Sequence, residues 1–357
     1  MRIVTVHLLN DYSGSPKVLM QLVKGFVKND IETHLYTCGS REGFLSNIPK
    51  VNHHFYWYRF VKNPIIRLVF LTLSQLFIGL KLIIFLKKTD VLYVNTVLPF
   101  GAGIAGKLKG CKVIYHIHET SMKPKLLKDF LFGIVNWSAS EVVYVSNFLA
   151  KQEFMEIKKN VLYNVLEQDF VDIAYKNLNR EKETKIILMI CSLKAYKGVN
   201  EFLKLAKNNP HFTFKLVVNA NQNEIREFYK NDVIPPNLNI YPTQKDTHKF
   251  YQEASILLNL SDVNLWVETF GLTILEGMAY GLPVIVPPVG GVVELVEEGK
   301  NGYLIDNKNI DLISKKINQL LTDSTLYNKM SRESLEKSKF FGQEYFESES
   351  LRIISKI

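Results

Sequence analysis

Residues 266–285 read WVETFGLTILEGMAYGLPVI and carry the clearest fold signal in this chain of 357 residues. The apolar pattern after Gly271 predicts a helix of about three turns, because Gly281 is typical just past a helix end and Pro283 cannot continue a helix. The apolar run Pro283–Val286 that follows predicts a buried strand. The start of such a helix offers unpaired N–H groups and a partial positive charge, a combination that suits a phosphate.

Short apolar runs alternate with helical patterns on both sides of this segment. In the second half of the chain, the predicted strands are 186–190, 215–218, 238–241, 255–260 and 283–286. In the first half, they are 2–9, 32–37, 90–94, 112–116 and 141–145. Strands that alternate with helices are typical of a parallel, doubly wound sheet, so we expect an α/β fold.

A polar stretch at 175–184 separates the two α/β halves. A single core stops growing at roughly 250–300 residues, so two domains are expected. We place them at 1–175 and 176–340, followed by a terminal helical segment at 341–357. Because open α/β sheets bind ligands at the carboxyl ends of their strands, we expect a ligand cleft between the halves.

The net charge of the chain is concentrated in its first half. The whole chain has 44 Lys+Arg and 35 Asp+Glu, a net charge of +9. Residues 1–180 hold 23 basic and 13 acidic side chains, and residues 51–128 hold 12 basic residues with Asp90 and Glu119 as their acids. An excess this localised indicates an anionic partner for the first domain, either a membrane surface or a nucleic acid.

The most apolar segment, 65–85, reads IIRLVFLTLSQLFIGLKLIIF. It is long enough to be a membrane-spanning candidate, but Arg67, Ser74, Gln75 and Lys81 interrupt it. Two interpretations stay open: a helix buried in the domain core, or a helix with one side in the membrane interface. The second is favoured by basic flanks at 59–62 and 87–88 and by a second basic and apolar stretch at 123–135.

The cysteines, Cys38, Cys111 and Cys191, have no CxxC spacing. This excludes a disulfide framework or a zinc ribbon and suits a reducing cytosol. The first residues, MRIVTVHLLN, begin directly with a strand-like run, so we expect no secretory signal.

Residues 101–106, GAGIAG, form a literal GxGxxG motif, and Glu119 follows where a dinucleotide-binding fold holds its ribose-binding acid. However, residues 96–100 separate the glycines from the preceding strand, whereas the fingerprint requires a tight turn directly after the strand. We therefore interpret these glycines as small residues that pack a helix against the sheet.

The segment 266–285 closely resembles the E-x7-E donor-binding signature of family 4 retaining glycosyltransferases, in the form E-x-F-G-L-x-x-x-E-x-M-A-x-G-x-P-V. The match continues through VGGVVELV at 289–296 and GKNGYL at 299–304. This resemblance implies the GT-B fold, in which two Rossmann-like domains face a central cleft and a C-terminal helix crosses back to the N-domain. It also implies transfer of a hexose from a nucleotide sugar, with a UDP-sugar favoured.

By that resemblance, Glu268 would bind hydroxyls of the donor sugar and Glu276 the ribose hydroxyls of the nucleotide. Ionised carboxylates accept charge-assisted hydrogen bonds from diols, each contributing about 1.5–3 kcal/mol. The resemblance assigns the diphosphate to the backbone around Phe270, Gly271, Leu272 and Thr273.

Residues 191–199, CSLKAYKGV, resemble the family's G-R-L-x-x-x-K-G element, whose Arg and Lys neutralise the leaving diphosphate. Lys197 occupies the Lys position, whereas Ser192 stands at the Arg position. Lys194 lies two residues further along and is our candidate for its replacement.

In the first half, the loop Ser13–Pro16 resembles the family's glycine-rich loop and places Gly14 beside the donor. A plain N-capping turn with Pro16 at the first helical position explains the same residues equally well. His118 resembles the family histidine that approaches the donor sugar, so we assign catalytic roles to His118, Glu268 and Lys197. Strand alternation points His116 to the same side as His118, and its role stays open.

No Asp-x-Asp motif and no His/Asp cluster with metal spacing occurs in the sequence, so we expect no metal or other cofactor. In GT-B enzymes, a helix N-terminus and lysines take the electrostatic role of a metal ion. The family mechanism implied is front-side displacement, in which the leaving phosphate accepts the proton of the acceptor.

These observations predict a cytoplasmic hexosyltransferase that is peripheral at the inner face of the cell membrane. Its contact with anionic lipid would run through 59–88 and 123–135, and its acceptor would be a glycan or lipid-linked glycan of bacterial surface polysaccharide, such as lipopolysaccharide or capsule. One alternative within the fold is a sugar-nucleotide epimerase. An alternative of another class is a nucleic-acid-binding protein, which is disfavoured because no known binding motif is present.

Overall fold

A computed structural model describes residues 1–39, 41–153, 155–178 and 185–355. The chain forms two compact units, Met1–Asn164 with Glu344–Ile357, and Val165–Gln343. Part of the predicted polar stretch, 179–184, and the last two residues of the predicted terminal segment lie outside the described residues.

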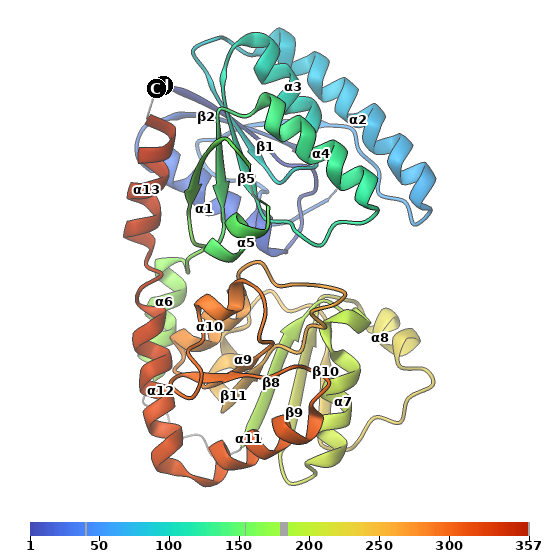
Figure 1. Ribbon diagram of the computed structural model, residues 1–357, viewed down its shortest axis with the longest axis vertical. Helices are drawn as coiled ribbons and strands as arrows, with labels where there is room; N and C mark the ends of the chain where they lie inside the picture. Colours follow the sequence, from blue (N-terminus) through green and yellow to red (C-terminus); the bar gives the residue numbers. More distant parts are fainter. Residues whose placement is uncertain (40, 154, 179–184, 356–357) are drawn as a thin grey trace. The chain divides into compact units, whose positions relative to one another are not determined.

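The first unit is built on a seven-stranded parallel sheet in the order β3-β2-β1-β4-β5-β6-β7 (Figure 1). Its strands are β1 Arg2–Val6, β2 Glu32–Cys38, β3 Asn52–Tyr56, β4 Val91–Asn95, β5 Lys112–Ile117, β6 Glu141–Tyr144 and β7 Lys158–Val161. Its helices are α1 Gly14–Lys28, α2 Pro64–Phe85, α3 Phe100–Lys109, α4 Lys125–Ser138, α5 Asn147–Gln152 and, at the end of the chain, α13 Gln343–Ser355. α2 packs on α3 and α3 on α4, so these three helices form one layer.

The second unit is built on a six-stranded parallel sheet in the order β10-β9-β8-β11-β12-β13. Its strands are β8 Ile186–Cys191, β9 Thr213–Val218, β10 Leu238–Tyr241, β11 Ile256–Leu258, β12 Val284–Val286 and β13 Gly302–Leu304. Its helices are α6 Gln168–Lys176, α7 Val199–Asn208, α8 Gln222–Phe228, α9 His248–Glu253, α10 Leu272–Ala279, α11 Ile310–Thr322 and α12 Ser324–Ser338, with 3-10 turns at Ala195–Lys197 and Gly291–Glu294.

The expected pair of parallel α/β sheets is confirmed, with differences at the borders. The first unit ends at Asn164, before the expected boundary at residue 175, because α6 packs within the second unit. There the Phe170 ring lies 4.4 Å from the ring of His248, centroid to centroid. β3 and β7 were not predicted, because these edge strands carry polar residues in place of an apolar run.

The glycines of the GxGxxG motif lie in α3 and serve packing, as predicted. A Cβ on Gly101 would lie 2.0 Å from the carbonyl oxygen of Gln75 in α2, and one on Gly103 would lie 1.9 Å from the Tyr115 hydroxyl. A Cβ on Gly106 would meet the side chains of two strand residues, the nearer at 2.5 Å. Only glycine therefore lets α3 approach α2 and the sheet this closely.

α2 has 22 residues, and its most apolar window has a mean hydropathy of 2.2, enough by length and composition to cross a membrane. Only 33% of that window is buried within the protein. The interpretation of 65–85 as a helix buried in the domain core therefore holds for one side of α2 only.

Candidate functional site

The candidate residues of the second unit gather at the carboxyl ends of β8 and β11, which are neighbours in the sheet. Lys197 follows β8, and Glu268 lies in the loop between β11 and α10. Lys197 Nζ forms an ion pair with Glu268 Oε1, and the same oxygen accepts a hydrogen bond from Ser261 Oγ at 3.0 Å. The fold thus joins two predicted residues that lie 71 positions apart in the chain.

The carboxyl group of Glu268 is held in its ionised form. Burial opposes its ionisation, but the positive charge of Lys197 and hydrogen bonds from Lys197, Ser261 and Asn259 outweigh burial, so the pKa of Glu268 lies below its ordinary value. The site therefore presents an ionised acceptor for hydroxyl groups directly beside a positive charge.

Two aromatic side chains hold Lys197 in place. Its Nζ lies 4.8 Å from the ring centroid of Trp266, and this ring stacks on Tyr196 with centroids 5.4 Å apart. Such a cation over an aromatic face is attracted by the ring quadrupole. Tyr196 and Trp266 therefore fix the ammonium group next to Glu268, a role that the sequence analysis did not assign to them.

Glycines allow the loops of this site to approach one another. A Cβ on Gly291 would lie 2.0 Å from the carbonyl oxygen of Thr269, and one on Gly198 would lie 2.1 Å from that of Leu260. Gly271, just before α10, has a backbone φ of 103°, which residues other than glycine rarely adopt. Any larger residue at these positions would push apart the loops that carry Lys197 and Glu268.

The start of α10 places the predicted phosphate-binding positions unequally. Gly271, Leu272 and Thr273 are partly exposed in its first turn. Phe270 is buried, and its ring packs against Phe341 with centroids 5.7 Å apart. The side chain of Phe270 therefore belongs to the core, and only its backbone is available to a ligand.

Glu276 lies within α10 and is 6% exposed. The hydroxyl of Tyr251, in α9, donates a hydrogen bond to Glu276 Oε2 at 2.6 Å. Burial and the nearby charge of Glu276 raise the pKa of Tyr251 well above its ordinary value, so this hydroxyl stays a donor. Tyr251 thus orients the carboxylate that the sequence analysis assigned to ribose.

Lys194 lies before the 3-10 turn that ends at Lys197, and its side chain is exposed. The ion pair with Glu268 is made by Lys197. The predicted replacement of the family's Arg by Lys194 therefore stays a prediction.

In the first unit, His118 follows β5 and is held by a residue that the sequence analysis missed. His118 Nε2 lies 2.9 Å from Asn95 Oδ1, while Asn95 Nδ2 donates to the carbonyl oxygen of Ser15 at 3.1 Å. Asn95 is completely buried at the end of β4, and its register partner is His116. It therefore ties His118 to the first turn of α1, where Gly14 was predicted to act.

His116 and His118 lie on the same side, with ring centroids 4.3 Å apart, as strand alternation predicted. His116 is completely buried, and burial lowers its pKa to about 3. Burial, and to a smaller extent the nearby His116, also lower the pKa of His118 well below its ordinary value. Both rings are therefore neutral at neutral pH. Burial raises the pKa of the adjacent Glu119 to about 7.

Gly14 is the first residue of α1, and a Cβ there would meet nothing within 4 Å. Ser13 is the N-cap residue, and its N–H donates to Asp11 Oδ1 at 2.9 Å. Sterics alone therefore do not require a glycine here. The plain capping turn is not observed either, because the Ser13 side chain makes no capping hydrogen bond and Pro16 is the third residue of α1, not the first.

Comparison with known proteins covers most of the chain. The sequence model of glycosyl transferases group 1 matches residues 172–337, and that of glycosyltransferase family 4 matches residues 12–152. The chain belongs to the family 4-like GT-B glycosyltransferases. The expected two-domain, Rossmann-like GT-B fold is confirmed with it.

Two curated relatives are similar to the chain in sequence, and one solved structure is similar to it in fold. The glycosyltransferase is 32% identical over 176 residues to an uncharacterized glycosyltransferase of Haemophilus influenzae, a match that covers 48% of each chain. It is 26% identical to the N-acetyl-alpha-D-glucosaminyl L-malate synthase of Bacillus anthracis, over 74% of this chain and 73% of the relative. It superposes on Anabaena HepE in complex with UDP-glucose with a TM-score of 0.80 and 17% identity, over 100% of both chains.

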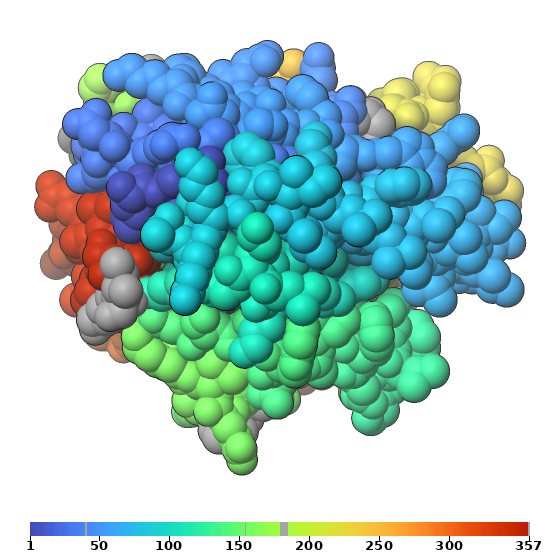
Figure 2. Space-filling model, turned by 90° about the horizontal axis from the view of Figure 1, so that it is seen from above, coloured from blue at the N-terminus to red at the C-terminus, as the bar shows by residue number. Residues whose placement is uncertain are grey.

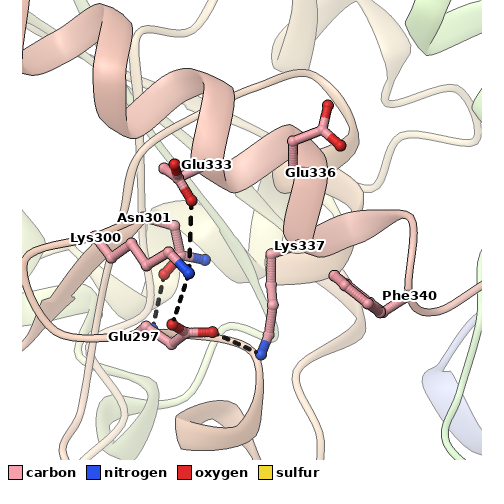
Figure 3. Close-up of a pocket in the computed structure, with 7 residues that line it drawn as sticks. All are labelled: Glu297, Lys300, Asn301, Glu333, Glu336, Lys337 and Phe340. Carbon is pink, nitrogen blue, oxygen red and sulfur yellow. Dashed lines mark hydrogen bonds and ion pairs between the residues drawn. The ribbon is translucent and has the colours of Figure 1, made fainter.

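A pocket elsewhere on the second unit of this glycosyltransferase holds none of the predicted residues (Figure 3). Lys300 Nζ lies 3.1 Å from Glu297 Oε2 and 3.6 Å from Glu333 Oε2, and Lys337 Nζ lies 3.0 Å from Glu297 Oε1. These ion pairs tie the loop before β13 to α12, which indicates a structural role. Within the described ranges, no group of three or more His, Cys, Asp or Glu side chains is arranged to hold a metal ion.

Proposed function

We propose that this glycosyltransferase transfers a hexose with retention of anomeric configuration, from a nucleotide sugar to a glycan or lipid-linked acceptor of bacterial surface polysaccharide. The observation that carries the proposal is the ion pair of Lys197 with Glu268 beside the start of α10. An ionised acceptor for sugar hydroxyls, a positive side chain and a helix N-terminus are the groups that a sugar diphosphate requires.

A UDP-sugar is the favoured donor. Glu268 would accept hydrogen bonds from sugar hydroxyls, Glu276 those of the ribose, and Lys197 with the backbone of the first turn of α10 would bind the diphosphate. The UDP-glucose bound in the HepE complex supports the choice of nucleotide, and the glucosaminyl group in the name of the Bacillus anthracis relative supports a hexose.

The proposed chemistry is front-side displacement. The bond from the anomeric carbon to the diphosphate oxygen breaks, the bond from the acceptor oxygen forms on the same face, and the leaving phosphate takes the acceptor proton. Lys197 and the N-terminus of α10 would stabilise the charge that develops on the phosphate, where preorganised groups contribute most. Neutral His118, held by Asn95, would bind a sugar hydroxyl near the reacting carbon.

The proposed location is the inner face of the cell membrane, with anionic lipid contacting 59–88 and 123–135. The basic residues at both ends of α2 support it, since Arg59, Lys62, Lys87 and Lys88 are exposed. A peripheral position would bring a lipid-linked acceptor within reach of the enzyme.

A transfer assay tests the function. Purified protein is incubated with a panel of UDP-hexoses and extracted glycolipid, and product anomers are read by NMR. Glu268→Gln should lose at least about a hundredfold in transfer, the value of one to two charge-assisted hydrogen bonds. Glu227→Gln is the control, because Glu227 is 73% exposed and its ion pair is a local one, with Lys230 one turn further along the chain and just past the end of α8.

Different outcomes distinguish the alternatives. Transfer with inversion would refute the retaining mechanism, and donor isomerisation without any acceptor would favour the epimerase. Full transfer activity of Glu268→Gln would refute the proposed site. If UDP raises the unfolding temperature of Glu268→Gln as much as that of the wild type, Glu268 does not act by binding the nucleotide.

A further inference from the structure

The two sides of α2 differ from those of an ordinary surface helix, because the buried side mixes apolar with polar residues and the exposed side is mostly apolar. The residues of α2 that are buried within the first unit are Leu71, Ser74, Gln75, Ile78, Gly79 and Leu82. The large apolar residues exposed on its other side are Ile65, Ile66, Leu68, Val69, Leu73, Leu76, Phe77, Leu80 and Ile84. A helix of a water-soluble domain normally directs its apolar stripe to the core and its polar residues to solvent.

The polar and small residues of the inner side have a packing role. Gln75 Oε1 accepts a hydrogen bond from the backbone N–H of Gly101 at 3.2 Å, and a Cβ on Gly79 would lie 3.2 Å from the Gly101 carbonyl oxygen. α2 therefore crosses α3 at close range through this side. The large apolar residues of the outer side are exposed, so packing within the first unit does not account for them.

The charges around α2 match an anionic surface. Basic side chains are exposed before the helix and after it, as described above. Asp90, the nearest acid in the sequence after α2, is 2% exposed and paired with Arg2 at 2.5 Å. Trp57 is exposed before the helix and packs edge-on against Phe70 at 5.2 Å, a placement typical of aromatics at a membrane interface.

α4 extends the same surface. α3 packs between α2 and α4, and Phe130 of α4 meets Phe100 of α3 with ring centroids 5.5 Å apart. Leu126, Phe130 and Trp137 of α4 are exposed. Figure 2 shows the atoms of α2 to α4, coloured from blue to green, side by side on one face of the first unit.

We propose that the outer side of α2 inserts into the hydrocarbon edge of a lipid bilayer, with the helix lying along the membrane plane. This inference deepens the membrane contact included in the proposed function, because it assigns binding to apolar insertion in addition to charge. Packing on α3 along one side holds α2 to the first unit, as expected for a helix that lies on a membrane and not across it. The helix would lay about 33 Å of its length on the bilayer.

Vesicle flotation with the full chain tests the insertion. Vesicles of phosphatidylcholine alone are compared with vesicles that also contain phosphatidylglycerol, at low salt and at roughly 1 M salt, where the Debye length is about 3 Å. We expect binding to both kinds of vesicle to persist at high salt. Binding that requires phosphatidylglycerol and disappears at high salt would overturn the proposal in favour of adsorption by charge.

Substitutions separate the two forces. The triple variant Leu76→Gln, Phe77→Gln and Leu80→Gln should lose binding to phosphatidylcholine at least tenfold, whereas Lys62→Gln with Lys87→Gln and Lys88→Gln should weaken only low-salt binding to phosphatidylglycerol. The control for the apolar variant is Val233→Gln with Leu312→Gln and Phe340→Gln, which alters exposed apolar residues of the second unit. Equal binding by the apolar variant and its control would refute the insertion.

The alternative explanation for the exposed apolar side of α2 is that it binds a second copy of the chain. Mass photometry in the absence of lipid would reveal it: a stable dimer that the apolar triple variant dissolves, together with no flotation, would overturn the proposal. The UDP-induced thermal shift should be equal in all these variants. If UDP causes no thermal shift in the wild type, the donor proposal alone is refuted. If the wild type does not float with vesicles, the insertion alone is refuted.

Discussion

α10 and α2 are both apolar helices, yet α10 is mostly buried within the protein and α2 is mostly exposed. In α10, the residues from Ile274 to Ala279 are buried, because β11, β12, α6 and α12 surround it. α2 packs mainly on α3 and leaves its most apolar side outside. An apolar composition therefore indicates that a helix is shielded from water. How many of its sides pack against protein indicates whether the protein alone provides that shielding.

The largest expected effect comes from one substitution made in both helices. Leu275→Ala in α10 should lower the free energy of unfolding by about 2–5 kcal/mol, because it empties a buried site. Leu76→Ala in α2 should change it by less than about 0.5 kcal/mol. Urea unfolding monitored by circular dichroism measures both, and equal losses would show that the outer side of α2 is packed against protein.

Removing a lysine should also have different effects at the site beside α10 and on the surface of α2. Lys197→Met leaves the partly buried Glu268 without its main counter-charge, which should cost about 1–3 kcal/mol. Lys81→Met in α2 removes an exposed ammonium that donates to the carbonyl oxygen of Phe55 at 3.3 Å and lies 5.5 Å from the ring centroid of Tyr36. Because the group is exposed, its loss should cost less than about 0.5 kcal/mol. Thermal unfolding of the two variants provides the measurement.

Lys197→Met should also change the pH dependence of activity. In the wild type, the pKa of Glu268 is depressed, so the stability that its ionised form contributes is present above its unfolded pKa and is lost as the pH falls through the depressed value. Without Lys197, burial acts with less opposition and raises the pKa. The acid limb of the kcat/KM profile should therefore move to higher pH in Lys197→Met, and an unmoved limb would argue against Glu268 as the titrating group.

Two glycines test how tightly α2 is attached. Gly101→Ala should destabilise the first unit by about 1–3 kcal/mol, since its Cβ would overlap the Gln75 carbonyl oxygen of α2. Gly133→Ala in α4 meets nothing within 4 Å and should stabilise by about 0.5–1 kcal/mol, because alanine favours a helix interior. Hydrogen exchange in α2 should accelerate in the first variant alone.

The smallest effect concerns a buried amide. Asn95→Asp would place a carboxylate against His118 Nε2 and should raise the pKa of His118, because the charged imidazolium gains a partner. NMR titration of the His118 ring measures the change. Tyr93→Phe is the matched control, since Tyr93 contacts His116 and not His118; an equal shift in both variants would show a general loosening of the unit.

The sequence predicted the parts of the fold that depend on local patterns. Alternating apolar runs predicted the central strands. The separation of the glycines at 101–106 from the preceding strand predicted close packing in place of a nucleotide fingerprint. The polar edge strand β3, NHHFY, was missed because it has no apolar run and is defined by its pairing with β2. The end of the first unit was misplaced because α6 owes its position to contacts with α9 and α10.

Within the candidate site, local motifs marked Glu268, Lys197 and His118 one at a time. The pairing of Lys197 with Glu268 depends on β8 and β11 being neighbours, which follows from the strand order and not from any motif. Asn95 was missed for a similar reason: an asparagine at the end of a buried strand has many ordinary roles. The signal that points to it is its register partner, His116, on the next strand.

The placement of α13 has a practical consequence for dissecting the chain. Its residues from Glu344 onward belong to the first unit, where Lys28 Nζ meets Glu347 Oε2 at 2.8 Å and Lys112 Nζ donates to the carbonyl oxygen of Ile353 at 2.8 Å. The first unit is therefore assembled from two separate pieces of the polypeptide, whereas the second is one uninterrupted piece, Val165–Gln343. A fragment cut at Asn164 would lack the helix that buries Phe346 and Ile354, so the first unit is best isolated by splicing α13 back on through a short linker.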